Sequence, residues 1–499
     1  MFERSSGILL HISSLSGKDG IGTFGKEAYE FVDFLKRSNQ KLWQILPLGT
    51  TSYGDSPYQS FSAFAGNPYF IDMEELVNRG GLNREDIDNA DLIGHKEYID
   101  YEKIYNNKLA LLKKSYSNEA HNFTEEIKKF VEENSYWVEG YALFMAIKDK
   151  NHGLEWTKWE KKEKFAYIKT LRSLKEELKE EIDYYIYLQY LFYTQWEKLK
   201  RYANDNGIKI IGDLPIFISG DSADAWLKTE LFLFDEDKNM KVVAGCPPDV
   251  FSKDGQLWGN PLYNWKINRR RKYSWWIERM KSAFSMYDIV RIDHFRGFES
   301  YWEIPGDAKT ARNGRWVKGP GMELFKAIKS ELGDLPIIAE DLGFMTKEVE
   351  KLLHDSEYPG MKILEFGFGG GNDNGYLPHN YPENSVAYTG THDNETVVGW
   401  NQNIDQWQRD YARNYLRDYL GWGEVTDDNI HMAMVEGVMK SKAILAITPM
   451  QDFLGLDNRA RINTPSTLGN NWKWRLKGDE LKDDLANYIS DITKRYNRF

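Results

Sequence analysis

The stretch Tyr287-Asp-Ile-Val-Arg-Ile-Asp-His-Phe-Arg-Gly297 begins as a buried strand and ends in closely spaced ionisable side chains. Side chains alternate along a strand, which predicts Arg291, Asp293 and Phe295 on one face and Ile292 and His294 on the other. We therefore expect Arg291 to lower the pKa of Asp293 and to keep this carboxyl ionised at the strand end. Such a carboxylate could act as a nucleophile or an electrostatic stabiliser, but a purely structural ion pair has the same pattern.

Short apolar runs of this kind recur along the chain, with helical segments between them. The predicted strands cover residues 7–12, 42–48, 208–217, 288–295, 335–342, 361–368, 385–393 and 443–450. Helical spacing of apolar residues occurs at 26–35, 322–332, 346–353 and 405–420. Strands that alternate with helices indicate an α/β protein with a parallel sheet, and eight such strands predict a (β/α)8 TIM barrel.

The spacing between the predicted strands is uneven, which indicates large insertions in a single catalytic barrel domain, residues 1–499. Residues 50–206 are expected to be a largely helical insertion after the second strand, with Lys/Glu-rich amphipathic segments at 125–133 and 171–199. Residues 218–286, rich in Trp and Pro, form a second insertion after the third strand. After the eighth strand we expect only a loop and one amphipathic helix at 479–496, and no C-terminal β-sandwich.

The composition narrows the class of protein. The net charge is −11, and no Lys/Arg-rich run could form a phosphate-binding stripe, so nucleic acid is not an expected partner. Cys246 is the single cysteine, which excludes an internal disulfide and is typical of a reducing compartment. The first residues lack a secretory signal and no apolar run reaches membrane length, so we expect a cytoplasmic protein without a membrane partner. The 17 Trp and 30 Tyr suit a large core or a surface that contacts amphipathic ligands such as sugars.

Carboxylates follow four of the predicted strands. In a TIM barrel the active site lies at the carboxyl ends of the strands, where this sequence places Asp213, Asp293, the pair Glu340 and Asp341, and Asp393. Any one of them could be a structural cap, but several like charges on one rim cost stability unless they are used. Two carboxylates in different environments are what glycosidic bond chemistry requires: one protonates the leaving oxygen, and the other attacks carbon or activates water.

Other chemistries have weaker support in the sequence. A metal site could use His392, Asp393, Glu395, His294 and Asp213, but no His-x-His pair follows a strand and no Glu-x-x-His lies on a helix. The glycine-rich segment 367–375 does not match the dinucleotide-binding spacing, and Tyr-Leu-Pro follows it instead of a helix. No Gly-x-Ser-x-Gly elbow is present. Neither a metal nor another cofactor is expected.

Several longer motifs together are highly specific. They are Leu48-Gly-Thr-Thr-Ser-Tyr-Gly-Asp-Ser-Pro-Tyr58, Ser62-Ala-Phe-Ala-Gly-Asn-Pro-Tyr69, Gly212-Asp-Leu-Pro-Ile216, Pro247-Pro-Asp-Val-Phe-Ser-Lys-Asp-Gly-Gln-Leu-Trp-Gly-Asn-Pro261, Arg291-Ile-Asp-His-Phe-Arg-Gly297, Ala339-Glu-Asp-Leu-Gly343 and Gly390-Thr-His-Asp-Asn394. Through them the chain resembles, over nearly its whole length, the 4-α-glucanotransferases of the amylomaltase (disproportionating enzyme) family, glycoside hydrolase family 77 of the α-amylase superfamily.

The resemblance implies a role for each matching residue. Asp293 would be the nucleophile, Glu340 the general acid/base, and Asp393 the carboxylate that binds sugar hydroxyls and stabilises the transition state. The choice of Glu340 over Asp341 comes from the resemblance alone, because neighbouring strand residues face opposite ways. The implied substrate contacts are Tyr58, Asp213, Gln256, Trp258, Arg291, His294 and His392. Val250 departs from the family, whose active-site loop often has an aromatic residue there.

The implied activity is the transfer of α-1,4-glucan segments between maltooligosaccharides, or to glucose as acceptor, by a retaining double displacement. No cofactor and no calcium site are implied. A hydrolase with the same carboxylates is one alternative, which accumulation of free reducing ends from maltotriose would identify. A non-catalytic glucan-binding protein is another, which would leave the chain-length distribution of glucans unchanged.

Overall fold

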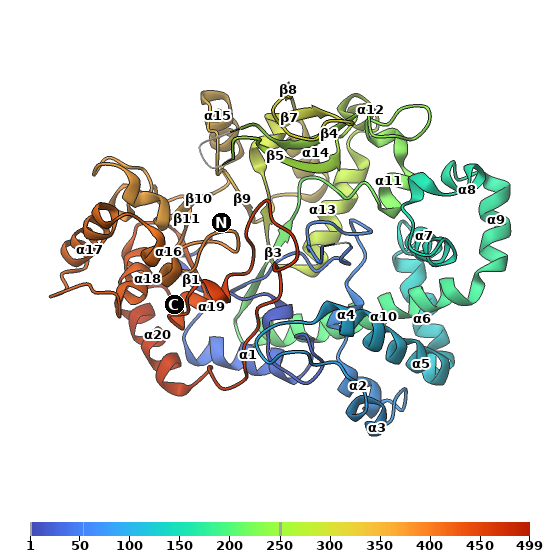
Figure 1. Cartoon of the computed structure of the whole chain (residues 1–499), viewed down its shortest axis with the longest axis horizontal. Helices are drawn as coiled ribbons and strands as arrows, with labels where there is room; N and C mark the ends of the chain where they lie inside the picture. Colours follow the sequence, from blue (N-terminus) through green and yellow to red (C-terminus); the bar gives the residue numbers. More distant parts are fainter. Residues whose placement is uncertain (1, 53, 249–251) are drawn as a thin grey trace.

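A parallel β-barrel lies at the centre of the computed structural model, which describes residues 2–52, 54–248 and 252–499 (Figure 1). Within these residues eight strands pair in the order β10-β11-β12-β1-β2-β3-β6-β9. They are β1 (Ser5–Leu9), β2 (Leu42–Gln44), β3 (Lys209–Leu214), β6 (Ile289–Ile292), β9 (Ile337–Ala339), β10 (Gly360–Ile363), β11 (Ser385–Tyr388) and β12 (Leu445–Pro449). All the predicted strands are confirmed, but each ends earlier than predicted, because the residues after its last paired position belong to loops or short helices.

The ring closes between β9 and β10 without a strand ladder. A backbone hydrogen bond from Ala339 N to Pro359 O, 3.0 Å, joins the two edges. Branched and aromatic side chains fill the interior as one buried cluster, as expected for a packed barrel core. The cluster comprises Leu9, Leu42, Ile211, Ile289, Ile338, Met361, Ile363, Val386, Tyr388, Leu445 and Ile447.

Helices surround the barrel where the 3.6-residue period predicted them. The confirmed ones are α1 (Lys26–Arg37), α14 (Met322–Leu332), α15 (Lys347–Ser356) and α17 (Gln406–Leu420). In α14 the buried residues Leu324, Phe325 and Ile328 recur at helical spacing and face the barrel side. The remaining barrel helices are α13 (Ser274–Met286), α16 (Val397–Asn403), α18 (Ile430–Lys440), α19 (Met450–Phe453) and α20 (Asp483–Arg495).

The long segment between β2 and β3 is mainly helical and lies to one side of the barrel, at the right of Figure 1. It contains α2 (Met73–Asn78), α3 (Arg84–Asp88), α4 (Tyr101–Lys103), α5 (Leu109–Glu119), α6 (Thr124–Glu133), α7 (Val138–Lys150), α8 (Lys161–Lys164), α9 (Ile168–Glu177) and α10 (Lys179–Asp205). Helix α10 packs against α7 and also reaches the barrel, where the Trp196 indole donates to Met286 O, 3.0 Å. This contact fixes the insertion to the helix that precedes β6.

A small antiparallel sheet, which the sequence did not predict, covers one side of the barrel mouth at the top of Figure 1. Its order within the described residues is β5-β4-β7-β8. Strands β4 (Val242–Cys246) and β5 (Gln256–Pro261) come from the segment after β3, with α11 (Ala223–Leu227) and α12 (Trp265–Arg270), whereas β7 (Ser300–Pro305) and β8 (Arg315–Lys318) follow β6. These strands of four to six residues are about as long as those of the barrel, but they lie between the predicted barrel strands, where no further strand was expected.

The chain between α19 and α20 crosses the mouth of the barrel, as the red segment in Figure 1 shows. Trp472 N donates to Ile462 O, 2.7 Å, which closes residues 463–471 into a loop. Among the described residues no helix is both long enough and apolar enough to cross a membrane.

Candidate active site

A cleft of about 590 Å³ opens at the carboxyl ends of the barrel strands. Asp293, Glu340, His392 and Asp393 all line it, from the loops after β6, β9 and β11. The structure therefore brings together the candidate catalytic carboxylates from three separate strands. The predicted substrate contacts Tyr58, Gln256, Trp258 and His294 also line the cleft.

Arg291 is the centre of the charge network below the cleft. Its Nη1 donates to both carboxylate oxygens of Asp213, at 2.7 Å each, and to Asp293 Oδ1 at 3.3 Å. Its Nη2 lies 3.9 Å from Glu340 Oε2. Burial disfavours the charge of Arg291, but the carboxylates of Asp213 and Asp293 raise its pKa, so the guanidinium stays protonated. Arg291 and Asp213 are only 3% and 2% exposed, so they position the cleft residues from beneath rather than lining the cleft.

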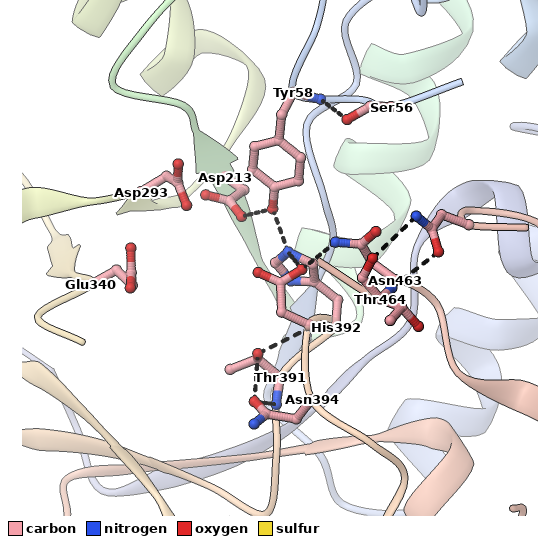
Figure 2. A network of polar contacts seen from close by, with 12 residues as sticks. Ser56, Tyr58, Asp213, Asp293, Glu340, Thr391, His392, Asn394, Asn463 and Thr464 are labelled. Carbon is pink, nitrogen blue, oxygen red and sulfur yellow. Dashed lines mark hydrogen bonds and ion pairs between the residues drawn. The ribbon is translucent and has the colours of Figure 1, made fainter. Parts of the chain in front are cut away.

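The carboxyls of Asp293 and Glu340 face the same space from neighbouring strands (Figure 2). Burial raises the pKa of Glu340 to about 8 and that of Asp293 to about 7, while Arg291 opposes both shifts. The expectation that Arg291 holds the pKa of Asp293 below its ordinary value is wrong, because burial outweighs the nearby cation. Because Asp293 is closer to Arg291 than Glu340 is, Asp293 loses its proton first, which leaves Glu340 protonated near neutral pH.

The backbone turns sharply just after β6. Asp293 N donates to Leu214 O, 3.0 Å, and His294 then takes a left-handed conformation with φ 49°. The His294 amide donates to Glu340 Oε2, 2.5 Å, so this turn also orients the Glu340 carboxyl. Because the strand has already ended, the predicted alternation fails: Phe295 packs outward against Phe325, with ring centroids 5.3 Å apart.

The two adjacent acids after β9 have different surroundings. Glu340 reaches the cleft, whereas Asp341 Oδ1 accepts from Met361 N, 2.6 Å, across the open seam of the barrel. Burial raises the pKa of Asp341, but its carboxyl faces β10 instead of the cleft. Glu340 is therefore the carboxyl of the cleft, whereas Asp341 connects β9 to β10.

Tyr58 and His392 form the opposite wall of the cleft. The Tyr58 hydroxyl donates to Asp213 Oδ2, 2.7 Å, and lies 3.0 Å from His392 Nε2, as the dashed lines in Figure 2 show. Burial lowers the pKa of His392, so the imidazole is neutral at pH 7. The Asp393 carboxylate, 3.4 Å from His392 Nε2, accepts from Asn463 Nδ2 at 2.6 Å. Asp393 is therefore held from one side and open to the cleft on the other.

The aromatic wall beside Asp293 comes from β5. The Trp258 indole meets His294 edge to face, with centroids 4.8 Å apart, and donates to Gln256 Oε1, 3.1 Å. Gln256 and Trp258, both predicted substrate contacts, thus line the cleft beside His294, the residue after the candidate nucleophile. Val250, the predicted departure from the family, lies outside the described residues.

Several cleft residues were missed by sequence reasoning. Asn463, Leu468 and Trp472 come from the loop between α19 and α20, which was treated only as a connection. Trp316, Phe344 and Phe366 also line the cleft from segments that carried no carboxylate signal. The only sequence signal was the turn-rich run Asn463-Thr-Pro-Ser-Thr-Leu-Gly-Asn-Asn-Trp472, in which an apolar and an aromatic residue stand among turn formers.

The alternative metal site does not have the required geometry in the described part of the chain. No group of three or more His, Cys, Asp or Glu side chains there is arranged to hold a metal ion. Asp213, one of the potential ligands, is instead engaged by Arg291 and Tyr58.

Comparison with known proteins identifies the family. The sequence profile of the 4-alpha-glucanotransferase family matches residues 10–482. The chain is 50% identical to the 4-alpha-glucanotransferase of Streptococcus pneumoniae over 100% of this chain and 98% of that protein. It is 48% identical to the Clostridium butyricum enzyme over 98% of this chain and 100% of that protein.

Solved structures agree with the sequence comparison. The amylomaltase from Streptococcus agalactiae, solved in complex with acarbose, has a TM-score of 0.96 at 45% identity, covering 99% of this chain and 100% of that one. The Corynebacterium glutamicum amylomaltase, at 17% identity and a TM-score of 0.81 over 99% of this chain and 75% of that one, shares the fold. With the carboxylates assembled at the mouth of a barrel of the same shape, this chain belongs to the 4-alpha-glucanotransferase (amylomaltase) family of transferases, glycoside hydrolase family 77.

Proposed function

We propose that this 4-α-glucanotransferase moves α-1,4-glucan segments between maltooligosaccharides, or to glucose, with retention of the anomeric configuration. Asp293 is the nucleophile, Glu340 the general acid/base, and Asp393 the carboxylate that binds sugar hydroxyls. The observation that carries this assignment is the placement of Asp293 and Glu340 on the two sides of the Arg291 guanidinium, with Glu340 the more readily protonated of the two. No cofactor is needed for this chemistry.

In the first step the protonated Glu340 carboxyl donates to the glycosidic oxygen while the Asp293 carboxylate attacks the anomeric carbon. The bond from that carbon to the leaving oxygen breaks, and an ester to Asp293 forms. The leaving glucan departs with a free 4-hydroxyl, and Glu340 becomes a carboxylate. The His294 amide, 2.5 Å from Glu340 Oε2, stabilises this anion and keeps its carboxyl oriented.

In the second step the acceptor's 4-hydroxyl occupies the position of the leaving oxygen. Glu340 takes its proton, and the oxygen attacks the anomeric carbon, which displaces Asp293 and restores both carboxyls. Two inversions at one carbon give net retention. Arg291, 3.3 Å from Asp293 Oδ1, supports the return of negative charge to this carboxylate.

Asp393 supports the transition state in a different way. Its carboxylate is fixed by Asn463 Nδ2 at 2.6 Å, and its backbone oxygen accepts from Arg461 Nη2 at 2.6 Å. A carboxylate held in this way can accept hydrogen bonds from sugar hydroxyls, and these bonds strengthen as positive charge develops on the sugar ring. Tyr58 and the neutral His392 complete the polar wall, and Gln256 and Trp258 cover the other side.

The alternative outcome with the same residues is hydrolysis, in which water replaces the acceptor sugar. The Trp258 indole against His294 and the loop that carries Trp472 support transfer, because both limit the access of water to the ester on Asp293. A cytoplasmic location is also proposed, and the single Cys246 supports it.

Incubation of the purified chain with maltotriose tests the proposal. Transfer gives glucose together with a ladder of longer maltooligosaccharides, which chromatography of the products resolves. Glucose and maltose without any longer product would mean hydrolysis, and an unchanged maltotriose peak would mean a binding protein. Asp293→Asn is the matched inactive control, since it preserves the side-chain shape while removing the nucleophile.

A further inference from the structure

Two large aromatic rings remain exposed on the wall of the cleft. Trp316, in β8, is 41% exposed, and Phe344, in the loop after β9, is 49% exposed. Both line the same cleft as Asp293 and Glu340. Neither ring contributes to the network around Arg291. Exposed rings that share one wall of a cleft are typical of a surface that a ligand covers.

Arg296 contacts the Trp316 ring and the backbone of Phe344. Its guanidinium carbon lies 3.8 Å from the centroid of the Trp316 ring, a cation–π contact. Its Nη1 donates to Phe344 O, 2.8 Å, and its Nη2 to Ser300 Oγ, 3.0 Å. Arg296 is only 3% exposed, so the indole stacks on a buried guanidinium, and Trp316 itself lines the cleft. One buried cation thus ties β8 to the loop that carries Glu340.

A second contact limits the motion of the Trp316 ring. Trp302, its cross-strand partner in β7, meets it at an interplanar angle of 67° with centroids 5.2 Å apart. The Trp302 indole is itself anchored by a hydrogen bond to Ala311 O, 2.8 Å. The Trp316 ring is therefore held on one face and from one side before any ligand arrives. Little conformational entropy remains to be lost when its open side is covered.

We propose that Trp316 and Phe344 form a platform that binds an α-1,4-glucan segment outside the point of cleavage and makes the enzyme prefer longer glucans. This inference rests on the proposed function. Glucose units have apolar C–H faces and hydroxyl rims, which suit a rigid aromatic ring beside polar groups. The platform lies in the same cleft as the carboxylates, so a glucan that occupies the central site extends toward it. Binding energy gained there is available only to a substrate long enough to reach it.

The test compares the initial rates of transfer from maltotriose and maltoheptaose for the unchanged chain, Trp316→Ala, Trp316→Phe and Phe344→Ala. We expect Trp316→Ala to lower kcat/KM for maltoheptaose by about tenfold, mainly through KM, and to change the maltotriose value by less than about twofold. Trp316→Phe keeps a ring and should retain much of the preference. Trp407→Ala is the matched control, because this exposed tryptophan of α17 does not line the cleft.

The maltotriose measurements also show whether each variant is folded. An equal loss for both substrates in Trp316→Ala, or the same change in Trp407→Ala, would overturn the platform while transfer by the unchanged chain still supports the proposed function. If the unchanged chain transfers glucan from neither substrate, the proposed function is overturned, and the platform with it.

Discussion

At the scale of single residues, Arg291 determines how the two central carboxyls share charge. Its guanidinium lies 3.3 Å from Asp293 Oδ1 and 3.9 Å from Glu340 Oε2. The nearer carboxylate gains more from the cation, so Asp293 ionises first although burial raises the pKa of both groups. The active form, with Asp293 ionised and Glu340 protonated, is thus the singly protonated state of the pair.

This charge distribution predicts the pH dependence of transfer. Below a pH of about 7 Asp293 takes up a proton and the nucleophile is lost, and above about 8 Glu340 loses the proton that the leaving oxygen needs. We expect kcat/KM for maltotriose to be greatest between these values and to fall on both sides. A profile that stays flat from pH 5 to roughly pH 9 would contradict the assignment. With a glucosyl fluoride donor, whose leaving group needs no proton, the rate of attack by Asp293 on the anomeric carbon should no longer fall on the alkaline side.

The division of labour predicts different defects in two variants. Glu340→Gln should slow transfer from maltotriose by about 100-fold or more, because it removes the general acid/base from both steps. A glucosyl fluoride should still glycosylate Asp293 in this variant, and azide, which needs no base, should release an α-configured azide product. Asp293→Asn should form no adduct.

Mass spectrometry of the peptide that contains Asp293 checks this prediction. Asp393→Asn serves as the comparison, since it weakens the stabilisation of the transition state but leaves both central carboxyls in place. An adduct on Asp393, or a β-configured azide product from Glu340→Gln, would show that the nucleophile or the stereochemistry has been assigned wrongly.

At the scale of an element, β5 has two faces with different surroundings. Trp258 lines the cleft against His294, whereas the neighbouring Leu257 is exposed and does not line it. This alternation allows the contribution of the indole to be separated from the integrity of the strand.

We expect Trp258→Ala to lower the ratio of transfer to hydrolysis by about threefold to tenfold, because the intermediate on Asp293 becomes accessible to water. Quantifying longer maltooligosaccharides against released reducing ends gives this ratio. Leu257→Ala, the matched control, should leave it unchanged. If Trp258→Ala slows transfer and hydrolysis equally, the indole does not shield the intermediate and only packs the strand.

At the scale of the whole molecule, residues near the two ends of the chain meet at the barrel. Arg498 is fully buried: its Nε donates to Met439 O at 2.6 Å, and its Nη2 to Ser441 O at 2.9 Å. Its backbone oxygen accepts from Ser6 N, 3.1 Å. Its Nη1 also donates to Ser5 O, 3.3 Å, so one side chain joins the end of α18 to β1.

Arg498→Ala should lower the free energy of unfolding by about 3 kcal/mol, because two buried carbonyls lose their donor and a cavity remains. Denaturant unfolding measures this loss, and kcat per folded molecule should be unchanged. Arg459→Ala, at a side chain that is 85% exposed, should stay within about 0.5 kcal/mol. Equal stability of both variants would show that Arg498 does not hold the chain ends together.

Much of this architecture was determined by the sequence itself. Eight apolar runs of strand length, separated by amphipathic helices, predicted the barrel, and α14 was predicted with the bounds that the structure has. These features are local, since the period of apolar residues depends on neighbours a few positions apart. The position of a carboxylate directly after a strand is also local. For this reason Asp293, the pair Glu340 and Asp341, and Asp393 could be expected at one rim before their distances were known.

Only the tertiary structure decided which of these groups meet and which of them are protonated. Strand β6 ends at Ile292, so Phe295 turns outward while the amide of His294 reaches Glu340. The small sheet joins strands from the segment after β3 and the segment after β6, and Trp316 of this sheet lines the cleft. Burial reversed the expected direction of the Asp293 pKa shift. Burial, strand ends and contacts between distant segments depend on the whole chain packing together, and a short stretch of sequence contains none of that information.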